Sequence, residues 1–499
     1  MGEVLKRSAF SPNIKERQDY SCALFDAQGR LLAQAAHLPV HLGSMPASVR
    51  AVLAALKLHE GDCAVVNDPY AGGTHLPDLT VVAPVFASGR LLGYTANRAH
   101  HADIGGAAPG SMSPQVDLMA EGLVIPPCLL RTSRGARTQA FGLILANTRT
   151  PREREGDLNA QLAACDRGAA RLLQLHQRHG TRLARHSDAL LAHSRKLLLH
   201  SLHKLTPGRF RAEDVLEDDG AGTRDIAIRL VLTVARDRLV FDFTGSHPQV
   251  RGGVNAVRAV TESAVLYSVL CCCEPLPPVN HGCFEPITVI APEGTVVNAR
   301  RPAPVAGGNV ETSQRIVDVC LAALARAAGR GAACSQGTMN NVSLGGAWPD
   351  GRAFTYYETI AGGCGAGPAA AGASATHSHM TNTLNTPVEA LEHAYPLRVE
   401  EYALIEDSGG EGAREGGSGV TRRLRALVPC SYGLLTERRE RGPAGAAGGA
   451  AGAPGRNLLR RGKKTQRLPA KCQGTLQAGE CLEIRTPGGG GHGKRGIGA

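Results

Sequence analysis

Two apolar runs joined by a tight turn constrain the fold of this chain more than any other feature. Residues 79–86, "LTVVAPVF", and residues 91–98, "LLGYTANR", have the composition of strands and flank the turn "ASGR" at 87–90. If the strands pair about this turn, the numbers of opposite residues sum to about 177. His100 then lies opposite Pro77, between His75 and Asp78. The sequence therefore predicts a hairpin whose open end gathers polar side chains.

These polar side chains include the candidate metal ligands His75, Asp78 and His100, with Asp103 as a fourth candidate. Two imidazoles and one carboxylate, with open positions, suit a catalytic Zn, Mn or Fe ion, which polarises a carbonyl or generates hydroxide. Pro77 prevents a continuous helix here. The flanking glycines, which allow close approach to a ligand, are Gly72, Gly73, Gly105 and Gly106. The alternative is a polar loop with capping histidines and an Asx turn.

Two further histidine pairs are candidates for supporting roles. "HLPVHLGSM" (37–45) contains His37 and His41, either of which could support the metal ligands or be an ordinary core or loop histidine. "THSHMTNTLNTP" (376–387) places His377 and His379 on one face if it is extended. We expect this polar loop to hydrogen-bond a substrate or ligand, and a second metal pair is the alternative.

The length of 499 residues is too great for one ordinary core and indicates several domains. Periodicity predicts an α+β, multidomain chain with mixed sheets, a helical insertion and a β-rich C-terminal region. We expect an α/β domain carrying the hairpin at 1–150, a helical segment at 151–222, broken near Gly180, an α+β domain with a Gly/Ala-rich polar loop at 223–400, and a β-rich domain at 401–499.

Several function classes are disfavoured. No run approaches the roughly 18 apolar residues of a membrane span, and the N-terminus has no apolar signal region, so a cytoplasmic location is expected. The net charge of +11 comes from scattered arginines without the stripe that nucleic-acid binding needs. The tail "GGGGHGKRG" (488–496) mimics a phosphate-binding loop, but Arg495 replaces the needed Ser/Thr. No segment predicts an ATP site.

Six separated segments, in order, resemble the hydantoinase B/oxoprolinase family. They are "IKERQDYSCALFDAQGRLLAQAAHLPVHLGSM", "NDPYAGGTHLPDLTVVAPVF", "RAHHADIGGAAPGSM", "GNVETSQRI", "GTMNN" and "HSHMTNTLNTPVE". The family includes the B subunit of ATP-dependent N-methylhydantoinase, the C-terminal half of 5-oxoprolinase and the α subunit of acetone carboxylase. The resemblance runs from residue 1 to about residue 493.

The resemblance implies a hetero-oligomer in which a hydantoinase A-type subunit binds ATP and phosphorylates the substrate oxygen. This chain would be the B subunit of an ATP-dependent cyclic amide hydrolase, opening the ring of a hydantoin or 5-oxoproline. In the acetone carboxylase relative, a His-x-x-Asp pair and a later His hold manganese, and this pattern falls on His75, Asp78 and His100. His101 and Asp103 would then support the metal ligands or contact the substrate, and they would shuttle protons. The alternatives are a non-catalytic scaffold that completes the partner's site and an acetone-carboxylase-like carboxylating subunit.

Overall fold

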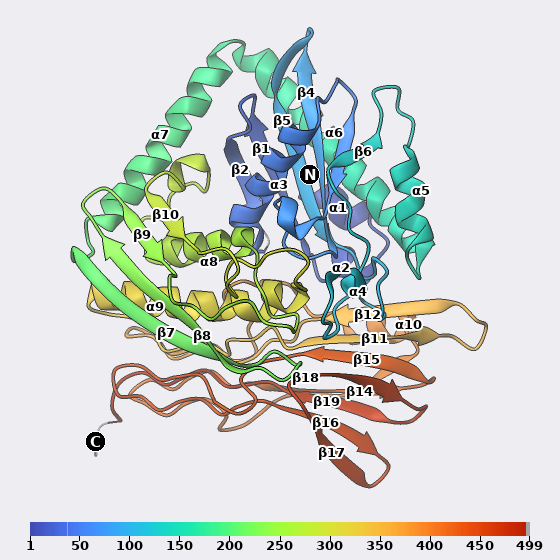
Figure 1. Cartoon of the computed structure of the whole chain (residues 1–499), viewed down its shortest axis with the longest axis vertical. Helices are drawn as coiled ribbons and strands as arrows, with labels where there is room; N and C mark the ends of the chain where they lie inside the picture. Colours follow the sequence, from blue (N-terminus) through green and yellow to red (C-terminus); the bar gives the residue numbers. More distant parts are fainter. Residues whose placement is uncertain (37, 496–499) are drawn as a thin grey trace.

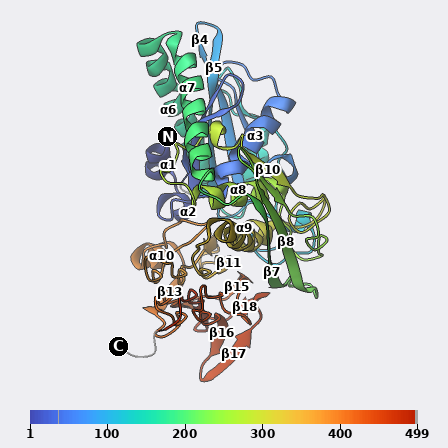
Figure 2. The same ribbon diagram turned by 90° about the vertical axis from the view of Figure 1, so that its left-hand side faces the viewer.

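The chain is arranged in three tiers, which Figures 1 and 2 show from two directions. The computed structural model describes residues 1–36 and 38–495. An N-terminal sheet with helices on both faces forms the upper tier, and a second sheet with two helices forms the middle. Two strand-rich sheets form the lower tier. Within the described residues, no helix is both long enough and apolar enough to cross a membrane.

The first sheet contains the hairpin predicted from the sequence. Its strand order is β2-β1-β5-β4-β3-β6, and all its pairs are antiparallel. The strands are β1 (Tyr20–Asp26), β2 (Leu31–Ala36), β3 (Cys63–Val66), β4 (Asp78–Ala87), β5 (Arg90–His100) and β6 (Cys128–Arg131). Val81 packs in one core cluster and Val82 in another. Because both faces of β4 are buried, its sequence is almost continuously apolar rather than alternating.

Helices lie on both faces of this sheet and near the lower ends of its strands (Figure 1). They are α1 (Gly2–Ser8), α2 (Pro12–Lys15), α3 (His41–Ala55), α4 (Leu118–Glu121), α5 (Gln139–Ala146), α6 (Pro151–His179) and α7 (Arg182–Leu202), with the short η1 (Pro69–Ala71). The predicted break near Gly180 is confirmed, since α6 ends there. The expectation of helix to residue 222 is wrong in its last part, because β7 (Gly208–Asp218) is a strand that pairs with its neighbour.

The middle tier joins the first sheet to the C-terminal region. Its sheet has the order β10-β9-β8-β7 and adds β8 (Arg224–Val234), β9 (Leu239–Asp242) and β10 (Ile287–Ile290). Helices α8 (Arg258–Leu270) and α9 (Ser313–Ala328) belong to this tier, with the short η2 (His281–Cys283). A five-residue π-helix, η3 (Gly308–Thr312), runs directly into α9.

The lower tier is built from two sheets and the short helix α10 (Val388–Ala394). The first contains β11 (Asn341–Ala347), β12 (Ala353–Glu358), β15 (Cys430–Leu435) and β18 (Lys471–Leu476). The second contains β13 (Leu397–Leu404), β14 (Val420–Ala426), β16 (Arg456–Arg461), β17 (Lys464–Leu468) and β19 (Cys481–Arg485). β11 pairs with β15, so strands from both sides of the boundary expected at residue 400 share a sheet. The four-part domain division stays a prediction, whereas the multidomain α+β class is confirmed.

The glycine-rich tail packs tightly against other irregular segments below these sheets. A Cβ atom on Gly488 would lie 1.8 Å from the Ser408 carbonyl oxygen, and one on Gly489 would lie 1.9 Å from that of Cys364. The backbone N–H of Gly489 donates to Gly417, and that of Gly490 donates to Cys334. These N–H groups are used within the protein, so the glycines serve close backbone packing.

Candidate metal centre

The hairpin brings the first residue of β4 opposite the last residue of β5. Asp78 pairs directly with His100, so their numbers sum to 178 rather than the expected 177. The difference arises at a bulge between Val85 and Phe86, which leaves Leu92 as the extra residue on β5. The carboxylate and the imidazole therefore lie side by side at the ends of the two central strands of the sheet, with His75 three residues before Asp78.

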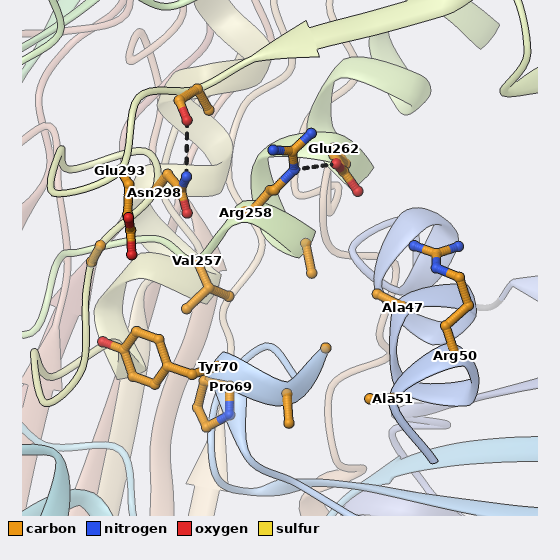
Figure 3. A pocket seen from close by; sticks show the side chains of 15 residues that line it. Ala47, Arg50, Ala51, Pro69, Tyr70, Val257, Arg258, Glu262, Glu293 and Asn298 are labelled. Carbon is orange, nitrogen blue, oxygen red and sulfur yellow. Dashed lines mark hydrogen bonds and ion pairs between the residues drawn. The ribbon is translucent and has the colours of Figure 1, made fainter. Parts of the chain in front are cut away.

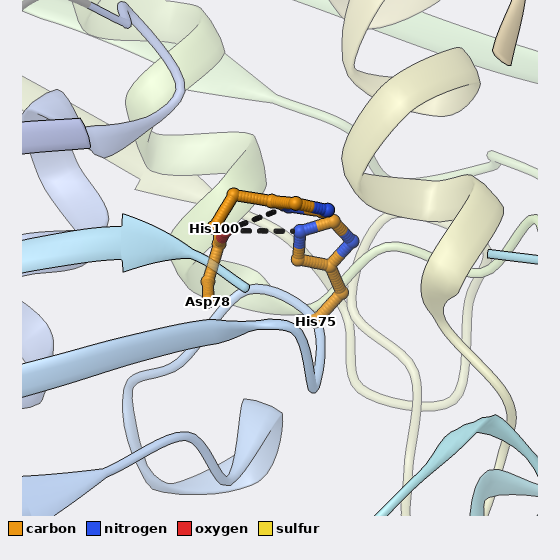
Figure 4. A group of neighbouring side chains, drawn as sticks. All are labelled: His75, Asp78 and His100. Carbon is orange, nitrogen blue, oxygen red and sulfur yellow. Dashed lines mark hydrogen bonds and ion pairs between the residues drawn. The ribbon is translucent and has the colours of Figure 1, made fainter. Parts of the chain in front are cut away.

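One oxygen of Asp78 lies between two imidazoles (Figure 4). Asp78 Oδ1 is 3.1 Å from His75 Nε2 and 3.3 Å from His100 Nδ1. One ligand atom from each of the three residues lies within 4.8 Å of the others. Ligand bonds of about 2.0–2.2 Å arranged tetrahedrally around one ion place neighbouring donor atoms about 3.4 Å apart, close to the two distances from Asp78 Oδ1.

The surroundings of these three side chains also fit a divalent metal ion. His75 Nδ1 and His100 Nε2 are buried and have no hydrogen-bond partner. Burial lowers the pKa of His100 to about 3, so its ring is neutral and able to coordinate at pH 7. The adjoining cavity measures about 10 Å³, close to the space that one water molecule occupies.

The other oxygen of Asp78 is held by two groups outside the three candidate ligands. Asp78 Oδ2 accepts a hydrogen bond from Thr74 Oγ1 at 2.6 Å and lies 3.4 Å from His41 Nε2. Ser21 Oγ contacts His41 Nδ1 at 2.9 Å. Burial alone would raise the pKa of Asp78, but the adjacent ring of His75 and the hydrogen bonds from the three histidines hold it well below its usual value. His41 thus lies where a supporting residue would act, whereas His37 lies outside the described residues.

His101 and Asp103 face other partners. His101 Nε2 contacts Gln161 Oε1 on α6 at 2.9 Å. Asp103 pairs with Arg149 at 2.8 Å and accepts a hydrogen bond from its backbone N–H. Neither residue lines the cavity beside the candidate ligands. Their expected role in proton transfer stays a prediction to which these contacts lend no support.

The loop that carries His377 and His379 is not extended. His379 has φ = 59°, in the left-handed region, so the condition under which the two rings would share one face, an extended segment, is not met. His379 contacts Tyr267 and lies 3.8 Å from Asp318, lining a separate cavity of about 580 Å³. Burial lowers the pKa of both histidines to about 4. Their role in substrate binding stays a prediction.

Residues from distant segments complete the small cavity, and reasoning from the sequence did not single them out. Asp19 directly precedes β1, and Asn309 lies in η3. Tyr357 lies in β12, and Thr381 lies in the segment between β12 and α10. Burial raises the pKa of Asp19 to about 7, against the opposing charge of Arg17. The sequence signal for Asn309 is its place in "GNVETSQRI", one of the six segments that resemble the family.

A larger cavity, about 650 Å³, lies between α3, η1 and the start of α8 (Figure 3). Arg50, Tyr70, Arg258 and Glu293 contribute polar groups to its wall. Arg258 pairs with Glu262 at 2.7 Å. None of the three candidate ligands lines it, whereas all three line the smaller cavity.

Comparisons with known proteins agree with this architecture. 5-Oxoprolinase 1 of Arabidopsis thaliana is 38% identical over 522 residues, which cover 99% of this chain and 40% of that protein. The chain therefore spans well under half the length of this relative. The ATP-dependent caprolactamase of Pseudomonas jessenii superposes with a TM-score of 0.93 at 28% identity, over 99% of this chain and 89% of that one. Nucleotide-free acetone carboxylase shares the fold, with a TM-score of 0.89 at 19% identity over 99% and 73%.

The family model described as hydantoinase B/oxoprolinase matches residues 1–495, almost the whole chain. The six segments quoted from the sequence fall within this match. The chain belongs to the hydantoinase B/oxoprolinase family.

Proposed function

We propose that this chain opens the ring of a cyclic amide, such as a hydantoin or 5-oxoproline, after a partner subunit has activated the ring carbonyl with ATP. The observation that carries the proposal is the buried arrangement of His75, Asp78 and His100 at the open end of the hairpin. The names of two similar proteins support it, because 5-oxoprolinase and caprolactamase are both named after cyclic amides. The name of the caprolactamase also states that it depends on ATP.

ATP would bind to a hydantoinase A-type partner rather than to this chain. The chain aligns with only 40% of the Arabidopsis 5-oxoprolinase, so a separate polypeptide can supply what the rest of that longer protein contains. The glycines of the tail at Gly488 and Gly489 have no room for a ligand against their backbone. Because ATP is supplied inside the cell, we place the reaction in the cytoplasm.

His75, Asp78 and His100 would hold a divalent ion, with Mn, Zn and Fe as the candidates. When bound, such an ion supplies Lewis acidity and lowers the pKa of water. Thr74 and His41 fix the second oxygen of Asp78, which orients the carboxylate toward the two imidazoles.

The chemistry follows from the weakness of an amide as an electrophile. Phosphorylation of the carbonyl oxygen by the partner converts the ring carbon into a reactive centre. Water adds to this carbon, and the C–N bond breaks as the ring nitrogen gains a proton and departs as an amine, which leaves an acyl phosphate. A second water hydrolyses the acyl phosphate to the carboxylate and inorganic phosphate. Asp19 is the carboxyl group of the cavity outside the candidate ligand set, and we assign it the transfer of the proton to the ring nitrogen.

Co-purification with an A-type partner tests the proposal. The complex should convert ε-caprolactam, 5-oxoproline or hydantoin to the ring-opened product only with ATP. His75→Ala should abolish turnover while the complex persists, and full ATP-coupled activity in this variant would refute the catalytic role.

Two alternative functions have their own signatures. Purified protein that carries no transition metal and is insensitive to chelators would favour a non-catalytic scaffold that completes the partner's site. ATP turnover that depends on bicarbonate would identify a carboxylating subunit.

A further inference from the structure

The π-helix η3 contributes Asn309 and Val310 to the small cavity beside the candidate metal centre, and Asn309 is the polar residue of the two. A π-helical turn inside an α-helix is rare and is frequent at functional sites. Gly308 begins the turn, and a Cβ atom there would lie 1.8 Å from the carbonyl oxygen of Asn255. The backbone of η3 is therefore pressed against the segment that contains Asn255, and this contact sets the position of Asn309.

Asn309 is buried, with an exposed fraction of 4%, and lines the cavity beside His75, Asp78 and His100. Its Nδ2 lies 3.2 Å from His75 Nε2. Its Oδ1 has no hydrogen-bond partner. A buried acceptor left without a partner costs about 1–3 kcal/mol, a cost that a donor on an incoming molecule would remove.

Asn255 is a buried asparagine whose amide oxygen and amide nitrogen both have hydrogen-bond partners in the backbone, as expected for a structural role. Asn255 Oδ1 accepts from the backbone of Val250, and its Nδ2 contacts three carbonyl oxygens. Asn309 has no such set of backbone partners, although it lies in the segment packed against Asn255. Asn309 lines the same cavity as Thr381, whose hydroxyl also has no hydrogen-bond partner.

The chemistry of a cyclic amide complements this side chain. A small ring locks its amide in the cis form, so the ring N–H and C=O lie on one edge. A carboxamide has an acceptor oxygen and two amide hydrogens, one of which remains after the other faces His75. We propose that Asn309 binds the amide edge of the ring before the partner phosphorylates the ring oxygen, with Oδ1 accepting the ring N–H and Nδ2 donating toward the ring oxygen.

This inference rests on the proposed function and assigns Asn309 a contact with substrate. It predicts that the preferred rings carry a hydrogen on the nitrogen that is cleaved. The cavity of about 10 Å³ has room for about one water molecule and not for a ring. Access therefore requires movement of the segment around Thr381 and Thr383, which forms no helix or strand.

Binding to the intact complex without ATP tests the inference. The probes are ε-caprolactam, 5-oxoproline and hydantoin, and, for the one bound most tightly, its derivative methylated on the cleaved nitrogen. The wild-type complex should bind the N–H ring at least about 10-fold more tightly, which corresponds to one hydrogen bond of about 1.4 kcal/mol. Equal binding of the two rings by the wild type would overturn the inference without any variant.

Asn309→Ala and the milder Asn309→Ser separate hydrogen bonding from steric fit. Both should lose the preference because the N–H ring binds more weakly, while the methylated ring binds as before. A preference lost because the methylated ring binds more tightly would indicate simple crowding and would overturn the inference. The control, Asn298→Ala, lies at the other cavity (Figure 3) and should retain the preference.

Bound metal and ATP-coupled turnover distinguish this inference from the proposed function. The Asn309 variants should keep the wild-type metal content, and loss of metal would show that Asn309 only supports the ligands. Absence of ATP-coupled ring opening in the wild type would refute the proposed function. Turnover in the wild type with an unchanged KM in Asn309→Ala would refute the role of Asn309 alone.

Discussion

The ring of Tyr357 stacks on the ring of His100, with centroids 4.6 Å apart and an angle of 23° between the planes. The two residues lie in different sheets, His100 at the end of β5 and Tyr357 in β12. The Tyr357 hydroxyl donates to Asn341 Oδ1 at 2.7 Å, and Asn341 Nδ2 donates to Glu311. The lower tier thus orients a candidate ligand that the upper tier carries.

Replacing this stacking partner should weaken metal binding. Tyr357→Leu removes the aromatic face that holds the His100 ring, so we expect metal affinity to fall about 10-fold. Tyr357→Phe keeps the stack and loses only the hydroxyl, so its metal affinity should equal that of the wild type. Titration with Zn or Mn measures both variants. An equal loss in the two would assign the effect to the hydroxyl rather than to the stack.

His100 and His101 are neighbours in sequence but should differ completely in metal binding. His100→Ala removes a candidate ligand, so metal affinity should fall by more than the roughly 100-fold that loss of a supporting residue causes. His101→Gln leaves the ligand set intact and should retain the wild-type metal content, since His101 faces Gln161. Metal analysis after gel filtration compares them. Loss of metal only in the His101 variant would reverse the assignment.

Glu311 should make stability depend on pH. Burial raises its pKa from 4.5 to about 7, so the folded state binds the proton more tightly than the unfolded state. Its contribution is fully present below pH 4.5 and is lost as pH rises to about 7, with a slope of at most about 1.4 kcal/mol per pH unit.

Glu311→Gln is the variant that isolates this effect, because its side chain is neutral throughout. The difference in unfolding free energy between wild type and variant should therefore shift in favour of the variant between pH 4.5 and 7. Denaturant titrations at several pH values measure it. A difference that does not change with pH would mean that Glu311 titrates normally.

The glycine-rich tail should tolerate no side chain at Gly489. Gly489→Ala forces a Cβ atom to 1.9 Å from a carbonyl oxygen, which should cost about 3 kcal/mol or more. Gly142→Ala is the control, since Gly142 lies in α5 with no atom near the added carbon. That change should stabilise by roughly 0.5–1 kcal/mol, because alanine is the better helix former. Thermal unfolding compares the two, and equal melting temperatures would contradict the tight packing.

The sequence alone located the candidate ligands because they depend on a local structure. A four-residue turn between two apolar runs determines which residues face each other, and the bulge at Leu92 changed the register by only one residue. The helical break at Gly180 was also local. β7 was missed because its polar and charged residues lack a clear alternation within the segment expected to be helical.

The sequence determined the chemistry available at the hairpin, two imidazoles and a carboxylate, since turn geometry and alternation act over a few residues. Only the tertiary structure decided what surrounds them. It turned His101 and Asp103 toward α6 and Arg149, and it brought Asn309 and Tyr357 to the site from later segments. Such contacts depend on how separate sheets and helices pack, and no periodicity within one segment encodes them.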